Sequence, residues 1–205
     1  MWPKDFDINV SRESLDDLQI YHKLLLKWQP AINLVSNKTL QDSWVRHFAD
    51  SAQLSNYIPY GVKTIMDWGS GAGFPGSVLA VMRPELDFML VESDERKCQF
   101  LRTVSRETSA TMRIENARIE DVVAKFEAPD LVTARALKPI VQLLDFGARY
   151  IKAGVPMCYL LLKGEAADKE IQDAQERYIF DVDRHASLTH AEACVLLLRD
   201  IKCRY

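Results

Sequence analysis

Residues Ile65–Gly76 decide the fold, and they read IMDWGSGAGFPG. The apolar start of this stretch predicts a buried strand, and its end predicts a helix with Pro75 in the first turn. Between them, Gly69, Gly71 and Gly73 allow positive φ angles and the close approach of a ligand to bare backbone. A strand, a glycine turn and a helix in this order are typical of a site for a nucleotide-like cofactor.

Two carboxylates narrow the choice of cofactor. Glu92 ends the next predicted strand, where it can accept hydrogen bonds from both ribose hydroxyls of an adenosine. Asp67 stands two residues before the first glycine, where it can face an ammonium group and would repel a pyrophosphate. We therefore expect S-adenosylmethionine. The spacing of Gly71, Gly73 and Gly76 also matches the dinucleotide fingerprint, so NAD is the alternative, and a tight turn without ligand is the third possibility.

Short apolar runs alternate with helical stretches after Gly61, which predicts βαβ units and a parallel sheet. Strands are expected at residues 64–67, 87–92, 112–116, 131–134 and 157–162, with an antiparallel edge formed by residues 178–181 and 193–201. The predicted fold class is α/β, with a Rossmann-like, doubly wound and mostly parallel sheet of seven strands.

The residues before position 60 predict two amphipathic helices packed on this sheet. Apolar side chains recur at three- and four-residue steps in both segments. Ser14 with Asp17 forms a capping box at the start of the first helix, and Pro30 is a plausible end. Thr39 with Asp42 offers a second capping box.

Composition sets the broad class of the protein. The chain has 205 residues, of which 48% are hydrophobic and 27% charged, which predicts one globular domain with helices in 1–59 and a cofactor-binding core in 60–205. Its four cysteines form no C-x-x-C pair, so we expect no metal site, no disulfide and a reducing cytoplasm. Signal-like and membrane-spanning patterns are missing, and we expect a monomer.

Charge is distributed unevenly along the chain. The formal net charge is −3, which by itself disfavours a nucleic-acid partner. Residues Leu131–Lys163, however, carry five basic side chains and one acidic side chain. A basic face on an acidic protein is therefore possible, and an ordinary mixed-charge surface is the alternative.

These residues resemble a known family, the 16S ribosomal RNA guanine-N7 methyltransferases, also called glucose-inhibited division protein B. The similarity covers about residues 24 to 165. It is carried by the motifs Asp67–Gly76, Arg46–Ser51, Asn116–Glu120, Thr133–Ala136 and Leu162–Gly164, which follow the family's order and rough spacing. The resemblance implies methylation of N7 of guanine 527 in 16S RNA, with the RNA or a small-subunit precursor as partner.

The resemblance also implies roles for individual residues at the predicted carboxyl ends of the strands. It assigns cofactor contacts to Gly69, Phe74, Glu92, Ile119, Glu120 and Arg135. Arg135 is also expected to orient the cofactor or the target guanine, with an ordinary surface ion pair as the alternative. The positions of Arg118 and Lys163 suit contacts with RNA phosphate, and a solvated surface is the alternative for both. His47, at helical spacing from Asp50 and Ser51, is either a substrate contact or a buried structural group.

The reaction chemistry is consistent with that resemblance. An exocyclic amine usually needs an Asn/Asp-Pro-Pro-aromatic turn after the fourth strand, and this chain has Asp130–Pro139 without it. No cysteine has the adjacent base or electropositive loop that a thiolate mechanism requires. Guanine N7 already carries an in-plane lone pair and needs no proton removed. A nicotinamide-dependent oxidoreductase and a non-catalytic nucleotide-binding module are the competing functions.

Overall fold

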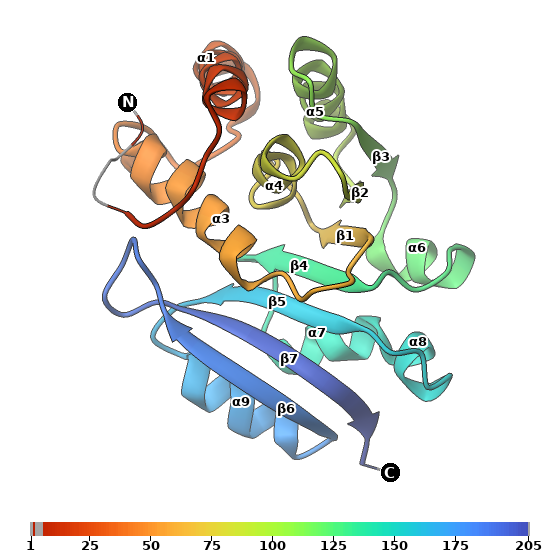
Figure 1. Cartoon of the computed structure of the whole chain (residues 1–205). Coiled ribbons are helices and arrows are strands. Elements are labelled where there is room, and N and C mark those ends of the chain that lie inside the picture. Colours follow the sequence, from red (N-terminus) through yellow and green to blue (C-terminus); the bar gives the residue numbers. More distant parts are fainter. Residues whose placement is uncertain (1, 3–5, 205) are drawn as a thin grey trace.

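The computed structural model describes Trp2 and residues 6–204, and its centre is a seven-stranded sheet (Figure 1). The strands are β1 (Thr64–Trp68), β2 (Asp87–Glu92), β3 (Met112–Asn116), β4 (Leu131–Arg135), β5 (Cys158–Lys163), β6 (Tyr178–Ala186) and β7 (Cys194–Cys203). Their order in the sheet is β3-β2-β1-β4-β5-β7-β6. The first five strands pair in parallel, and β7 lies antiparallel between β5 and β6. The predicted mostly parallel sheet with an antiparallel edge is confirmed.

Helices cover both faces of the sheet. They are α1 (Arg12–Ile32), α2 (Asn37–Leu40), the π-helix η1 (Trp44–Ala49), α3 (Asp50–Ala52), the 3-10 helix η2 (Gln53–Tyr57), α4 (Gly76–Met82), α5 (Glu95–Glu107), α6 (Ile119–Lys125), α7 (Ile140–Phe146), α8 (Ala148–Lys152) and α9 (Ala167–Gln175). Figure 1 shows α1, α3, α4 and α5 on one side of the sheet and α6 to α9 on the other. Leu18 and Phe48 of the N-terminal helices share one buried cluster with Val78 of α4 and Leu90 of β2.

The N-cap of the first helix lies three residues before the expected one. The Ser11 side chain accepts a hydrogen bond from the Ser14 backbone N–H, so Ser11 is the N-cap. The Ser14 hydroxyl instead donates to the Val81 carbonyl, and the Asp17 carboxylate accepts from the Ser109 backbone N–H at 3.1 Å. The predicted capping box is therefore wrong, because tertiary contacts engage both of its side chains.

The second N-terminal segment is a chain of short helices rather than one helix. The Thr39 hydroxyl lies inside α2 and donates to the Ser36 carbonyl at 2.9 Å, so the capping box with Asp42 is also wrong. Pro30 lies within α1, which ends two residues later at Ile32. The left-handed conformation of Asn33 (φ 45°) then ends the helix.

The strand order fixes the place of the site. The chain leaves β1 toward β2 and β3 on one side and later returns to β4 on the other, so the strand order reverses between β1 and β4. Ligands of open α/β sheets bind at the carboxyl ends of the strands at such a reversal. The glycine turn follows β1, and Arg135 ends β4. Both predicted features therefore lie at this point.

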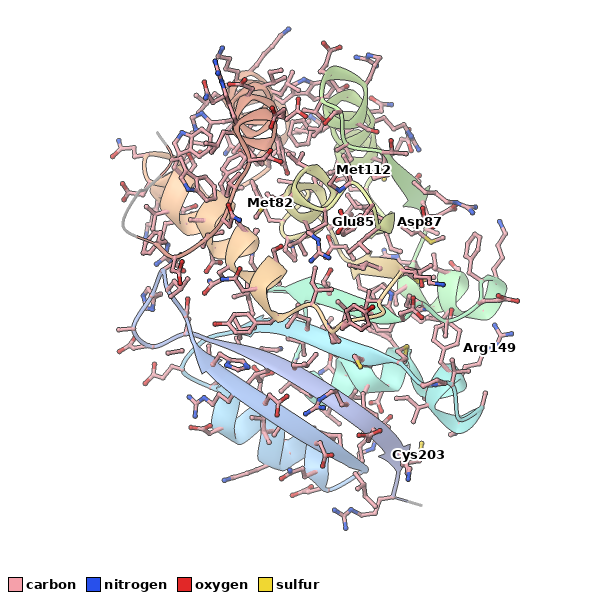
Figure 2. All side chains as sticks on the ribbon, in the orientation of Figure 1. Met82, Glu85, Asp87, Met112, Arg149 and Cys203 are labelled. Atoms are coloured by element: carbon pink, nitrogen blue, oxygen red, sulfur yellow. The ribbon has the colours of Figure 1, made fainter. Side chains whose placement is uncertain are left out.

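All four cysteines are free, and they lie apart in the sheet and helices. In Figure 2, Cys203 lies at the end of β7, far from Met112 on β3 at the other side of the sheet. In the described part of the chain, no three or more His, Cys, Asp or Glu side chains gather as a metal site would require. No described helix is both long and apolar enough to span a membrane.

Candidate active site at the glycine turn

The turn after β1 has the backbone that its glycines predict. Gly69, Gly71 and Gly73 have φ angles of 65°, 59° and 91°. A Cβ at Gly73 would lie 2.5 Å from the Tyr21 hydroxyl, which donates a hydrogen bond to the Ala72 carbonyl. Helix α1 therefore supports the turn from behind. The sequence places Tyr21 in the apolar stripe of this helix, and no sequence signal indicates the contact of its hydroxyl.

Glu92 binds the turn directly. One carboxylate oxygen accepts the Gly71 backbone N–H at 2.8 Å, and the other accepts the Asp94 backbone N–H at 2.8 Å. Asp94 in turn caps α5 by accepting from the Arg96 and Lys97 backbone N–H groups. Glu92 thus lies at the predicted place, at the end of β2, and it fixes two loops of the site relative to each other.

Asp67 ends β1 as predicted, but its side chain is buried under α4 rather than open at the surface of the turn. Its side chain is fully buried, and the Thr133 hydroxyl of neighbouring β4 donates to Oδ1 at 2.8 Å. A Cβ at Gly76 would lie 2.6 Å from the Asp67 Cβ, so the glycine lets α4 pack directly over this carboxyl. Burial raises the pKa of Asp67 to about 6, against the opposing effect of the Ser70 and Thr133 hydroxyls.

Arg135 is the last residue of β4, and its side chain binds the π-helix η1. Its Nη1 donates to the Arg46 carbonyl at 2.9 Å and lies 3.1 Å from Oδ2 of Asp50, and its Nη2 lies 3.0 Å from Nδ1 of His47. The guanidinium also lies 5.1 Å from the centre of the Phe74 ring. Arg135 therefore lies at the carboxyl end of β4, as predicted, and its side chain is bound to other groups of the protein.

The bonds to His47 define its protonation state. A guanidinium can only donate, so Nδ1 of His47 accepts from Arg135, and the ring proton lies on Nε2. Nε2 then donates to the Thr39 hydroxyl at 2.8 Å, which itself donates to the Ser36 carbonyl. Burial, with the charge of Arg135, lowers the pKa of His47 to about 3. His47 is a neutral group in this structure, and its ring stacks on Phe74.

Phe74 is buried between these groups. Its ring stacks on Tyr21 at 5.5 Å between centroids and on His47 at 5.1 Å, with 4% of the residue exposed. The predicted cofactor contact of Phe74 therefore has no open ring face in this structure. The ring instead joins α1, η1 and the glycine turn.

Asp50 joins the site to the loop between β6 and β7, a link that the sequence did not predict. Its Oδ1 accepts the Thr189 hydroxyl at 2.6 Å and the Gln53 side-chain amide at 3.1 Å. The side-chain oxygen Oε1 of Gln53 accepts a hydrogen bond from the Leu188 backbone N–H at 2.9 Å. Residues more than a hundred positions apart meet here, so no local pattern could have indicated them.

The residues after β3 lie beside Glu92. The Ala117 backbone N–H donates to the Glu92 carbonyl at 3.2 Å, and α6 starts two residues later. Ile119 is buried there, whereas Arg118 and Glu120 are exposed. The structure thus brings these three predicted residues to the same edge of the sheet as the glycine turn.

Lys163 is not a free cation, which counts against its predicted phosphate contact. Its side chain is 10% exposed and lies 2.8 Å from Oε2 of Glu170. Its Nζ also donates to the Lys138 carbonyl at 2.6 Å. Lys163 would have to break both contacts to bind a phosphate.

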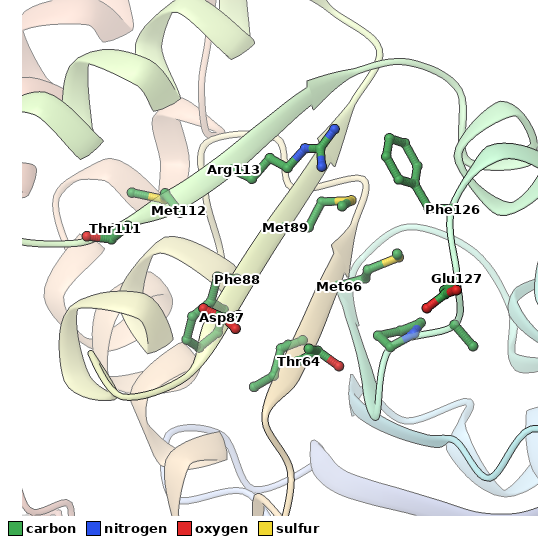
Figure 3. Close-up of a pocket in the computed structure, with 13 residues that line it drawn as sticks. Thr64, Met66, Asp87, Phe88, Met89, Thr111, Met112, Arg113, Phe126 and Glu127 are labelled. Carbon is green, nitrogen blue, oxygen red and sulfur yellow. The ribbon is translucent and has the colours of Figure 1, made fainter.

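Two cavities differ in their relation to the turn. One of about 400 Å³ lies beside Arg135 and is lined also by His47, Asp50, Lys163 and Thr189. A larger one of about 550 Å³ lies at the amino ends of β1, β2 and β3, with Met66, Met89 and Phe126 in its wall (Figure 3). Of these two, the smaller cavity is the one that adjoins the carboxyl ends of β4 and β5.

Known proteins resemble this chain in sequence. The model of the family "rRNA small subunit methyltransferase G" matches residues 14–197. The chain belongs to this family. A ribosomal RNA small subunit methyltransferase G of Rhodospirillum centenum is 46% identical over 198 residues, or 95% of this chain and 88% of that protein. The protein of that name from Ruegeria pomeroyi is 40% identical over 205 residues and 98% of both chains.

Solved structures share the fold of this methyltransferase G family member. A fibrillarin/NOP5P complex matches with a TM-score of 0.58 and 15% identity, over 76% of this chain and 81% of that chain. A precorrin-6y C5,15-methyltransferase from Geobacter metallireducens matches with a TM-score of 0.55 and 12% identity, over 98% of both chains. At such identities the likeness concerns the fold alone. The predicted family and the Rossmann-like methyltransferase fold are confirmed.

Glu92→Ala is expected to weaken S-adenosylmethionine binding by about 1–3 kcal/mol, because charge-assisted hydrogen bonds at the turn are lost. Calorimetric titration measures the change. Glu95→Ala is the matched control, since Glu95 is an exposed glutamate at the start of α5, three residues after Glu92, and pairs with Arg102. An unchanged dissociation constant for Glu92→Ala would remove this residue from the site.

His47→Gln is expected to destabilise the protein most above pH 6.5. The folded pKa of His47 is lowered to about 3, so between that value and 6.5 the unfolded chain holds a proton that the folded chain does not. The contribution of neutral His47 to the free energy of unfolding is therefore complete above pH 6.5. It falls as the pH is lowered toward 3, by up to about 1.4 kcal/mol per pH unit. Denaturant unfolding of both proteins at several pH values measures the difference, and a difference independent of pH would contradict the assignment.

Proposed function

We propose that this protein transfers the methyl group of S-adenosylmethionine to N7 of a guanine in 16S ribosomal RNA, which by resemblance is guanine 527. Its membership of the rRNA small subunit methyltransferase G family supports the RNA class. The proposed substrate is free 16S RNA or a small-subunit particle, and the proposed location of the protein is the cytoplasm.

The residues at the turn fit S-adenosylmethionine. The cofactor supplies an electrophilic methyl group on a sulfonium. Gly69 and Gly71 offer backbone without side chains, and the carboxylate of Glu92 lies within hydrogen-bond distance of the Gly71 N–H, at the place proposed for the ribose hydroxyls. Ile119 and Glu120 lie beside it, where an adenine adjoining that ribose would lie.

Glu92, Asp50 and His47 are already engaged in hydrogen bonds, and this observation supports the choice of N7. Glu92 accepts two backbone amides, Asp50 accepts Arg135 and Thr189, and both nitrogens of His47 are bonded. Asp67 is fully buried. A nucleophile with its own lone pair needs only alignment with the methyl group and exclusion of water, and guanine N7 meets that requirement.

The cavity of about 400 Å³ beside Arg135 is the proposed place of the target guanine. It adjoins the carboxyl ends of β4 and β5, and Arg135 in its wall lies over Phe74, which follows the glycine turn. Arg135 is the proposed positioning group, held in place by Asp50 and His47. Exposed Arg118 is the proposed phosphate contact, in place of Lys163, which is paired with Glu170.

Transfer of a radiolabelled methyl group tests the function. Small-subunit RNA and small-subunit particles, each lacking the modification, are incubated with the protein and labelled S-adenosylmethionine. We expect label in at least one of them, and binding of S-adenosylhomocysteine but not of NADH in calorimetric titration. Binding of NADH alone would favour an oxidoreductase, and cofactor binding without transfer to either substrate would contradict the proposed reaction.

A further inference from the structure

The loop between β4 and α7, residues 136–139, lies over the glycine turn. Ala136 has a φ angle of 52°, which bends the chain sharply after Arg135. Leu137 then packs against Gly69, so closely that a Cβ at that glycine would lie 2.6 Å from the leucine Cδ1. The position of this loop therefore decides how much of the turn is open and where one wall of the adjoining cavity stands.

A single ion pair holds the end of this loop that leads into α7, on both sides of Pro139. Lys163 Nζ donates to the Lys138 carbonyl at 2.6 Å, and Glu170 Oε2 accepts the Ile140 backbone N–H at 2.9 Å. The two side chains lie 2.8 Å apart, with exposed fractions of 10% for Lys163 and 21% for Glu170. Lys163 comes from the end of β5, and Glu170 comes from α9. The loop is thus bound to two elements that pack beside it.

The geometry of this pair differs from the other described ion pair of α9. Asp168, two residues before Glu170, binds Arg184 with exposed fractions of 66% and 50%. An exposed pair of that kind contributes little. Removing two charges from water is costly, and the Lys163 and Glu170 pair offsets part of that cost through hydrogen bonds to the loop backbone. Those bonds reach the two positions, 138 and 140, that flank Pro139.

We propose that Lys163 and Glu170 are positioning residues for methyl transfer, which set the 136–139 loop over the glycine turn. The inference rests on the proposed function, because the loop bounds the proposed cofactor and guanine sites. In this account Lys163 contacts no phosphate. Its charge serves to hold the Lys138 carbonyl, and through it Leu137, at a fixed place beside the methyl donor.

Three variants distinguish a role of the Lys163 and Glu170 pair in positioning the loop from a role in stabilising the fold alone. Lys163→Met leaves the partly buried carboxylate of Glu170 without its cation, so it is expected to lower the melting temperature as well as turnover. The double variant Lys163→Met with Glu170→Gln removes that unpaired charge, and the amide oxygen introduced at position 170 can still accept the Ile140 backbone N–H. Asp168→Asn is the matched control on the same helix.

Turnover at saturating cofactor and RNA is the first measurement. We expect Lys163→Met to lose about 10-fold to 100-fold in kcat, with little change in KM for RNA, because a misplaced loop affects alignment more than binding. The double variant is expected to regain the melting temperature but not kcat, since the Lys138 carbonyl still lacks its lysine donor. Asp168→Asn is expected to match the wild type. Recovery of kcat in the double variant would overturn the proposal and leave the pair a structural role only.

Two further measurements do not depend on turnover. Hydrogen exchange of residues 136–143 is expected to be faster in both Lys163 variants and unchanged in Asp168→Asn, and the Lys163 variants should bind S-adenosylhomocysteine more weakly. The salt dependence of RNA affinity is expected to stay at the wild-type slope, whereas a slope lower by about one would show a phosphate contact and overturn the proposal. A wild-type protein that transfers no methyl group would instead contradict the proposed function, while the exchange and binding results would still test the loop.

Discussion

Gly71→Val is expected to abolish measurable binding of S-adenosylmethionine, a loss of at least about 100-fold, while the protein stays folded. Gly71 has a φ angle of 59°, which a β-branched residue adopts only with strain. Its N–H also donates to Glu92, so a change of backbone conformation disturbs the carboxylate proposed for the ribose. An added Cβ meets no atom closer than 3.9 Å, so the fold itself has room for the side chain.

Gly61→Val is the matched control for Gly71→Val. Gly61 has a φ angle of 90° and no atom within 4 Å of an added Cβ, and it lies outside the turn. Both variants should therefore lose about 1–3 kcal/mol of stability from backbone strain, and only Gly71→Val should lose the cofactor. Titration calorimetry and thermal unfolding of the two proteins measure these effects. Retained affinity in Gly71→Val would mean that the turn does not face the ligand.

Arg135→Ala is expected to lower turnover about 100-fold while RNA affinity changes little. The guanidinium joins β4 to η1 through the Arg46 carbonyl, Asp50 and His47, and its loss leaves the Asp50 carboxylate with 17% exposure and no cation. The wall of the proposed guanine cavity is then free to shift, and small misplacements of reacting groups are costly. Single-turnover methyl transfer and RNA titration separate the two quantities.

Arg106→Ala is a suitable control for that experiment. Arg106 pairs with Glu107 on α5, and its side chain is 67% exposed. We expect it to retain wild-type turnover, salt dependence and stability, as an exposed pair contributes little. If Arg135→Ala behaved like Arg106→Ala in all three, Arg135 would be a surface ion pair, and the RNA site would have to be sought on the N-terminal helices.

The sheet and the glycine turn could be predicted because their signals are local. Each strand is a short apolar run bounded by turn residues, and the end of β2 at Glu92 agrees with the prediction. Once the strands are parallel, the position of the turn after β1 and of Arg135 after β4 follows from topology. The placement of Ile119 beside Glu92 follows in the same way from the end of β3.

The helix starts and several side-chain roles could not be predicted because distant residues decide them. Ser14 looked like a cap, but it lies inside α1 and donates to Val81. Lys163 looked like an exposed cation at a strand end, but Glu170 of α9 and the Lys138 carbonyl enclose it. Asp67 looked like a ligand contact, but α4 packs over it. A sequence shows which groups are charged, and only the packing shows which of them remain free.

The backbone of the second N-terminal segment also could not be predicted from local sequence patterns. A four-residue repeat of apolar side chains predicted one helix, whereas the chain forms a π-helix at Trp44–Ala49 between shorter pieces. The widened turn places the Arg46 carbonyl where Arg135 can donate to it. Such turns are common at functional sites, and they leave no periodic signal in a single sequence. The single domain and the monomer stay predictions.

The atom that receives the methyl group tests the central claim most directly. Small-subunit RNA methylated by this protein is digested to nucleosides for chromatography and mass spectrometry, and a second portion is reduced and treated with aniline, which cleaves the chain at 7-methylguanosine. We predict 7-methylguanosine as the only new nucleoside and cleavage at a single guanine. A methyl group on an exocyclic amine, a ring carbon or a ribose hydroxyl would contradict the account, because each of those positions requires chemistry that the described side chains at the turn are not free to perform.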